Sequence, residues 1–135
     1  KGINLLKKDG CDLVIASKYK KDSIVKNRKY LRVFISKFIT LTCRILFDSK
    51  ITDYSNTFRF YTVSLAEKFS ERKMIFKSPI GHLHNLLFIL KNKYSIKDIS
   101  TEYIETNLDS AVKIISMLRY LIELIYCIIL NKFLR

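Results

Sequence analysis

The sequence predicts an α/β fold, and three observations lead to this class. Hydrophobic residues make up 49% of the 135 residues, which is too large a share for a disordered chain and enough to build a core. Residues 13–16 form a short, continuous apolar run, as expected for a strand buried in a parallel sheet. Segments with the apolar spacing of helices lie on both sides of this run, so helices and strands should alternate.

The N-terminal part should contain a helix end, the buried strand, a loop and a long helix. Asp9-Gly10 ends the first helix, residues 3–8, because glycine readily adopts the conformation that closes a helix. Residues 17–29 form a loop with six Lys or Arg and a single acidic residue. Residues 30–47 have a strong helical stripe, which we expect to pack in the core and which consists of Leu31, Phe34, Ile35, Phe38, Leu41 and Ile45.

The C-terminal part should contain shorter elements and a final long helix at residues 110–133. Ser78-Pro79 is a typical helix start. The final helix has Arg119 and Glu123 on one face, and its uninterrupted apolar run is too short for a bilayer, which needs ~20 residues. We expect it to lie on a membrane surface or pack on the domain, with a truncated span as the third option. The other expected elements are a loop at 49–54, a short strand at 57–61, a short helix at 65–72 and an extended segment at 94–103.

The charge of the chain predicts an anionic partner. The formal net charge is +13, from 25 Lys and Arg against 12 Asp and Glu. Residues 1–44 hold 12 of the basic and 3 of the acidic residues, a net of 12 − 3 = +9. Such an excess in an apolar chain is typical of proteins that bind nucleic acid, an anionic membrane or a phosphate-bearing ligand.

Three residues in this basic part form a candidate phosphate site. Arg32 and Ser36 are four residues apart near the start of a helix, so they share a face where free N–H groups and the helix dipole favour an anion. Lys18 follows the predicted strand, at the sheet edge where open α/β folds bind ligands. Two cations and a hydroxyl can hold a phosphate group.

Cysteine and histidine do not indicate a metal or disulfide site. Cys11, Cys43 and Cys127 are odd in number and widely spaced, so we expect buried or free thiols. His82 and His84 are two residues apart on a helix and do not face each other, so we expect no metal there. No nucleic-acid motif occurs, and we do not expect nucleic acid as the main partner.

The chain resembles a known family at three motifs in order. The segment Asp-Leu-Val-Ile-Ala-Ser-Lys-Tyr, residues 12–19, is similar to a strand that ends in Gly-Ser-Arg-Tyr in that family. An Arg-x-x-x-Ser helix follows, and then an Asp-x-x-x-x-Phe-Arg-x-Tyr motif, matched by Asp53, Phe58, Arg59 and Tyr61. The resemblance, over residues 5 to about 125, is to family 2 glycosyltransferases, and specifically to polyprenyl (dolichyl) phosphate glycosyltransferases of the dolichol-phosphate mannosyltransferase type.

The resemblance implies a fold, a reaction and a set of site residues. It implies the C-terminal part of a GT-A (Rossmann-like) fold at residues 1–109, followed by a hydrophobic juxtamembrane helix, amphipathic and interfacial, at residues 110–135. The parent enzyme would move a sugar from a nucleotide sugar to a polyprenyl phosphate at the cytoplasmic face of a membrane. The implied acceptor-phosphate ligands are Lys18, Arg32, Ser36 and Arg59, and Asp53 is the implied catalytic residue, as a general base or in an orienting or structural role.

The chain also departs from the family pattern. It has no Asp-x-Asp motif, the family's ligand for the Mg²⁺ or Mn²⁺ that the complete enzyme would use, and it begins with Lys1 instead of Met. We therefore expect a fragment that is inert alone. Lys18 replaces an arginine, and residues 105–111 lose the arginine, glycine and lysine of a further family segment. The alternative function is a non-catalytic basic module that binds anionic membrane or nucleic acid.

Overall fold

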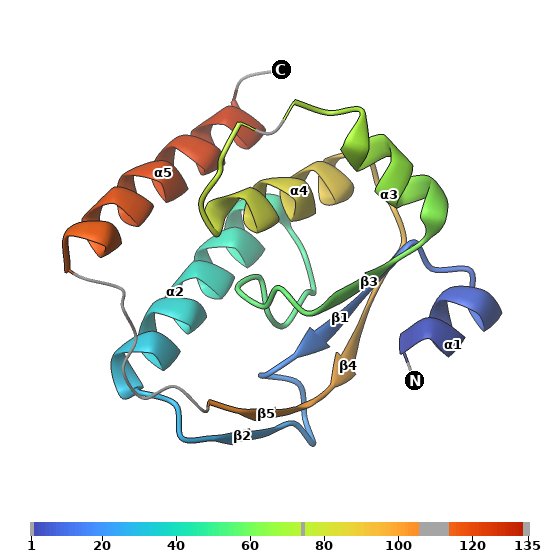
Figure 1. Cartoon of the computed structure of the whole chain (residues 1–135), viewed down its shortest axis with the longest axis horizontal. Helices are drawn as coiled ribbons and strands as arrows, with labels where there is room; N and C mark the ends of the chain where they lie inside the picture. The colour runs from blue at the N-terminus through green and yellow to red at the C-terminus, as the bar shows by residue number, and fades with distance from the viewer. Residues whose placement is uncertain (1, 74, 106–113, 134–135) are drawn as a thin grey trace.

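The protein is a mixed α/β structure, as the sequence predicts. Figure 1 shows a computed structural model, which describes residues 2–73, 75–105 and 114–133. The described elements, in chain order, are α1 (Gly2–Lys8), β1 (Leu13–Ser17), β2 (Ile24–Lys26), α2 (Tyr30–Phe47), β3 (Arg59–Tyr61), α3 (Val63–Ser70), α4 (Ile80–Lys91), β4 (Ile96–Ser100), β5 (Glu102–Ile104) and α5 (Ile114–Lys132).

Strand β1 is the centre of a three-stranded sheet. It pairs with β3 antiparallel on one side and with β4 parallel on the other, so Leu13 lies between Tyr61 and Ile96. All five residues of β1 are buried, which explains why its sequence shows no alternation of polar and apolar residues. This confirms the predicted buried parallel strand.

A second, two-stranded sheet was not predicted from the sequence. Strand β2 lies within the segment expected to be a loop, and it pairs in parallel with β5. The expected extended segment at 94–103 covers β4 and the first two of the three residues of β5, with Thr101 between the two strands. The three residues of β2 are too few to show a periodic pattern, so only pairing with a distant strand reveals it.

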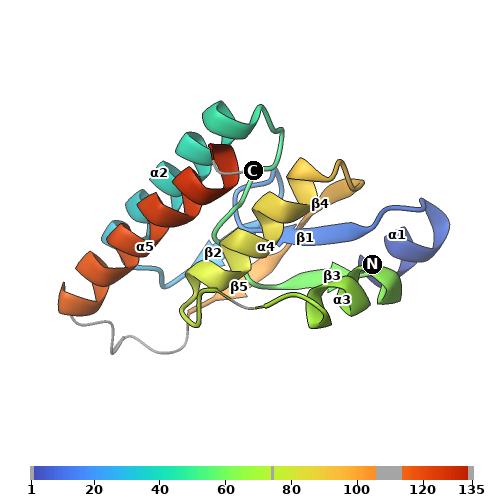
Figure 2. The ribbon, with the colours of Figure 1, turned by 90° about the horizontal axis from the view of Figure 1, so that it is seen from above.

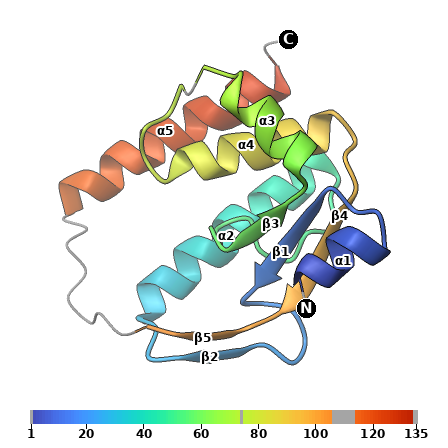
Figure 3. The same ribbon diagram turned by 45° about the vertical axis from the view of Figure 1, so that its right-hand side comes forward.

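Helix α4 lies at the centre of the hydrophobic core. Leu86, Leu87 and Ile89 are fully buried, and α5 packs on α4 through Leu124 and Cys127. The helix begins one residue later than predicted, at Ile80 with Pro79 at the N-cap position, and the Ser78 hydroxyl accepts a hydrogen bond from the N–H of Ile80 at 3.2 Å. Helix α1 lies beside β1 and β3, far from α2 and α5 (Figures 2 and 3).

The expectation that the apolar stripe of α2 packs in the core is wrong. Leu31, Phe34, Phe38, Leu41 and Ile45 are each more than half exposed, and only Ile35 in the stripe is partly buried. The buried face of α2 consists of Ser36, Thr40 and Cys43. This face is buried because its hydroxyls form hydrogen bonds inside the protein: the Thr40 hydroxyl accepts from the N–H of Tyr54 at 3.1 Å, and Ser36 is hydrogen-bonded to Ser55.

Helix α5 also exposes an apolar face, and it contacts α2 on the same side of the molecule (Figures 1 and 2). Ile122, Ile125 and Tyr126 are at least half exposed. The expected start of this helix at residue 110 lies outside the described residues. As expected, Arg119 and Glu123 share a face, and they form an ion pair at 2.9 Å. None of the described helices is both long enough and apolar enough to span a bilayer.

Candidate anion-binding site

A hollow of about 540 Å³ lies between the loop after β1 and the first turns of α2. Its lining includes three cations, Lys18, Arg28 and Lys37, and the described residues that line it include no carboxylate. Val25, Tyr30 and Val33 add an apolar wall. The hollow therefore combines positive charge with apolar surface.

The loop that forms the hollow is fastened to the end of β1. The hydroxyl of Ser23 donates to the carbonyl of Ser17 at 2.7 Å, and the N–H of Tyr19 donates to the Ser17 hydroxyl at 3.1 Å. Asp22 and Asn27 have positive φ angles of 71° and 59°, a conformation that Asp and Asn tolerate better than most residues. Of the cations in this loop, Lys18 and Arg28 reach the lining of the hollow.

Lys18 and Asp53 form a buried ion pair under the hollow. The Lys18 side chain is 5% exposed, and its Nζ lies 3.2 Å from Oδ2 of Asp53. The backbone N–H of Lys18 donates to the same oxygen at 3.1 Å. Burial lowers the pKa of Lys18, because it disfavours the charged form, and the Asp53 carboxylate opposes this shift.

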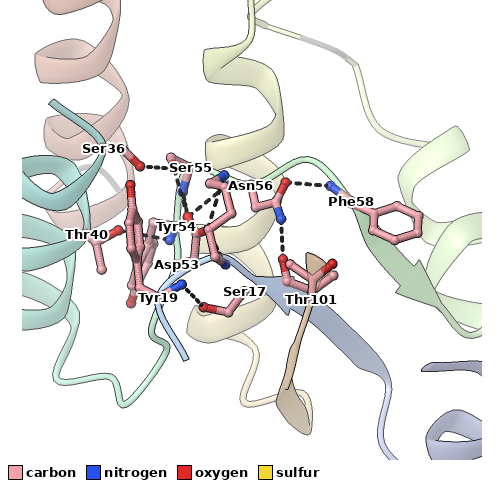
Figure 4. Close-up of polar contacts among 12 residues, drawn as sticks. Ser17, Tyr19, Ser36, Thr40, Asp53, Tyr54, Ser55, Asn56, Phe58 and Thr101 are labelled. Carbon is pink, nitrogen blue, oxygen red and sulfur yellow. Dashed lines mark hydrogen bonds and ion pairs between the residues drawn. The ribbon is translucent and has the colours of Figure 1, made fainter. Parts of the chain in front are cut away.

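The other oxygen of Asp53 is also occupied. Its Oδ1 accepts from the N–H and hydroxyl of Ser55 at 3.0 and 2.8 Å and from the N–H of Asn56 at 3.0 Å (Figure 4). Both oxygens of this fully buried carboxylate are thus used by protein donors. The contacts favour the orienting role over a general base, and the catalytic assignment of Asp53 stays a prediction.

Arg28 and Lys37 are the cations of the hollow that lack an acidic partner among the described residues. Arg28 Nη1 donates to the Tyr19 hydroxyl at 2.7 Å, and its guanidinium lies 5.9 Å from the ring centres of both Tyr19 and Tyr103. Lys37 Nζ lies 5.8 Å from the Tyr19 ring centre. Sequence reasoning did not single out these two cations, because neither belongs to a motif.

The structure links Ser36 to this region but gives Arg32 another partner. Ser36 is buried and bonds to Ser55, which in turn bonds to Asp53 (Figure 4). Arg32 forms an ion pair with Glu105 and does not line the hollow. Of the three residues of the predicted phosphate site, Lys18 and Ser36 thus belong to one buried network through Asp53 and Ser55, whereas Arg32 pairs with Glu105.

Arg59 is buried, and its guanidinium donates hydrogen bonds to backbone carbonyls. Its Nη1 donates to the carbonyl of His82 at 2.6 Å and its Nη2 to the carbonyl of Tyr54 at 3.1 Å. Burial lowers its pKa. Arg59 does not line the hollow, so a role in binding the acceptor phosphate stays a prediction.

Within residues 2–73, 75–105 and 114–133, no group of three or more His, Cys, Asp or Glu could hold a metal ion. His84 is buried, with its Nδ1 2.9 Å from Asn131 Nδ2, whereas His82 is exposed. The family segment expected at 105–111 lies, after Glu105, outside the described residues.

No protein-family profile, curated protein or solved structure matches this chain.

Proposed function

We propose that this chain is the acceptor-binding part of a membrane-associated glycosyltransferase with a GT-A fold. It holds the phosphate of a polyprenyl phosphate in the hollow, at the cytoplasmic face of a membrane. The parent enzyme uses a nucleotide sugar and Mg²⁺ or Mn²⁺, whose ligands this chain does not supply. One observation carries the proposal: a basic hollow, with no carboxylate among the described residues that line it, adjoins a helix that exposes an apolar face.

The cations of the hollow suit a phosphate group. Arg28 offers a planar set of donors and Lys37 a point charge, and neither is neutralised by a described acid. The charge of Lys18 is partly compensated by Asp53, so Lys18 contributes less to phosphate binding. Sugar transfer brings an anionic acceptor close to an anionic diphosphate, so fixed cations must offset their repulsion.

The apolar surface beside the hollow suits a lipid. Tyr30 lines the hollow and is 94% exposed, and it begins the same helix that exposes Phe34 and Phe38. An isoprenoid chain leaving the hollow along α2 would cover this stripe. Lys37 and Arg44 lie two turns apart on the flank of the stripe, where they can contact anionic headgroups.

Vesicle flotation tests this proposal. The protein is mixed with phosphatidylcholine vesicles that contain either polyprenyl phosphate or uncharged polyprenol. We expect preferential binding to polyprenyl phosphate, and at least ~10-fold weaker binding for the double variant Arg28→Gln/Lys37→Gln, which loses two charge-assisted contacts. Lys7→Gln/Lys8→Gln, which removes two exposed positive charges from α1, is the matched control and should change binding by less than about twofold.

Three outcomes would contradict the proposal. Equal binding to both vesicle types would show that the phosphate is not recognised. An equal loss for Lys7→Gln/Lys8→Gln would show that only net charge matters. Competition by single-stranded oligonucleotides with a steep salt dependence would favour the alternative nucleic-acid module.

A further inference from the structure

Arg28 and Lys37, which have no acidic partner in the part of the chain that the structure describes, share one neighbour, Tyr19. Its hydroxyl accepts a hydrogen bond from Arg28 at 2.7 Å, and its ring centre lies 5.9 Å from the Arg28 guanidinium and 5.8 Å from Lys37 Nζ. Arg28 belongs to the loop and Lys37 to α2, so Tyr19 contacts cations from both of these elements in the lining of the hollow.

The backbone of Tyr19 is held firmly. Its own N–H donates to the Ser17 hydroxyl at 3.1 Å, and the N–H of the preceding Lys18 donates to buried Asp53 at 3.1 Å. Figure 4 shows Tyr19 beside this network. The half-buried phenol thus extends from a fixed support to two side chains that are otherwise long and flexible.

We infer that Tyr19 is a positioning residue, which fixes Arg28 and Lys37 toward a bound phosphate. This inference rests on the proposed function. Arginine and lysine lose rotamer freedom when they bind an anion, and a side chain that restricts them in advance removes part of that cost. Among the described residues the hydroxyl is hydrogen-bonded to Arg28 alone, whereas the ring lies near both cations, so the two parts of Tyr19 can be tested separately.

The test is a mutant cycle measured on polyprenyl phosphate vesicles. Tyr19→Phe removes only the hydroxyl and should weaken binding about threefold, and Tyr19→Leu removes the ring as well and should weaken it about tenfold. In an Arg28→Gln background Tyr19→Phe should have no further effect, because its one cation partner is gone. Tyr19→Leu should still weaken binding there, through Lys37.

Tyr94→Phe is the matched control. The Tyr94 hydroxyl accepts from Lys68 at 2.7 Å, and its ring centre lies 5.1 Å from the same Nζ, so the pair has the same chemistry away from the hollow. Tyr94→Phe should leave binding unchanged. Urea midpoints of all variants, measured in parallel, separate a loss of stability from a loss of positioning.

The results separate this inference from the proposed function. If Arg28→Gln weakens binding but Tyr19→Phe does not, the positioning role is wrong and the hollow remains the phosphate site. An equal effect of Tyr19→Phe in both backgrounds also overturns the role, because the hydroxyl would then act without Arg28. If Arg28→Gln/Lys37→Gln binds like the unmodified chain, the proposed function itself fails.

Discussion

Replacing Asp53 with asparagine should strongly destabilise the fold. The change keeps the shape of the side chain, but it removes the one negative charge that pairs with Lys18 among the described residues, and the Lys18 side chain is 5% exposed. An amide group in place of Oδ2 would also point a donor at the Lys18 N–H, which now donates at 3.1 Å. The result is a buried ammonium without a counter-charge and a backbone donor without an acceptor.

The expected cost follows from burial. Breaking a buried ion pair by removing one partner costs ~3–5 kcal/mol, because the remaining charge stays desolvated. The free energy of unfolding of a typical domain is only ~5–15 kcal/mol. With a urea dependence of ~2 kcal/mol per M, the midpoint should fall by about 2 M.

The assay is urea unfolding followed by circular dichroism. Asp9→Asn is the control: Asp9 pairs with Lys97 at 2.7 Å, but both side chains are substantially exposed, so its loss should cost less than ~1 kcal/mol. If Asp53→Asn does not fold, Lys18→Met and Lys18→Met/Asp53→Asn keep the test open, and the double variant should be more stable than Asp53→Asn alone. A midpoint for Asp53→Asn equal to that of Asp9→Asn would refute the structural role and favour a purely catalytic one.

Two further predictions concern the exposed helix face and a buried histidine. Phe34→Ser/Phe38→Ser should leave the free energy of unfolding within ~1 kcal/mol of the original but weaken vesicle flotation at least ~10-fold, because these rings are 68% and 54% exposed. Leu86→Ala, at a fully buried position, should instead cost ~2–5 kcal/mol of stability. A larger loss of stability for the Phe34/Phe38 variant than for Leu86→Ala would contradict the fold. Burial, and secondarily the charge of Arg72, lowers the pKa of His84, so the unfolded chain binds a proton more readily than the folded one. Stability should therefore be lost as the pH falls from ~6.5 through the lowered pKa of the folded state. Free energies of unfolding measured between about pH 7.5 and about pH 5 should show this slope, and His84→Gln should flatten it.

The sequence predicted much of the fold because some signals are local. The helix at 30–47 matches α2 at both ends, since a long apolar periodicity is independent of what packs around it. The continuous apolar run of β1 indicated burial on both faces. The predictions of short elements were less accurate: the strand expected at 57–61 is observed only at Arg59–Tyr61, and β2 was not predicted. Strands of three residues depend on their partners more than on their own composition.

The candidate site was predicted only in part. Lys18 lies at the hollow as expected, because it directly follows a strand whose position the sequence indicated. Arg32 was predicted from its helical spacing with Ser36 and from motif likeness, and Arg59 from motif likeness alone. Arg32 pairs with Glu105, and Arg59 donates to the carbonyl of His82, two partners that lie far from them in the sequence, as well as to the nearer carbonyl of Tyr54. Arg28 and Lys37 share no motif, and only the meeting of the loop with α2 brings them to Tyr19.

The sequence alone thus determined where helices and the central strand form, and that the basic charge gathers in the first third of the chain. The tertiary structure decided which face of each helix is covered. An apolar stripe defines two sides of a helix, but the buried side of α2 is the one whose small polar groups satisfy the backbone and hydroxyls of residues 54 and 55. That choice leaves the apolar side of α2 exposed beside the hollow, because a hydrogen-bond network needs partners that only folding brings together.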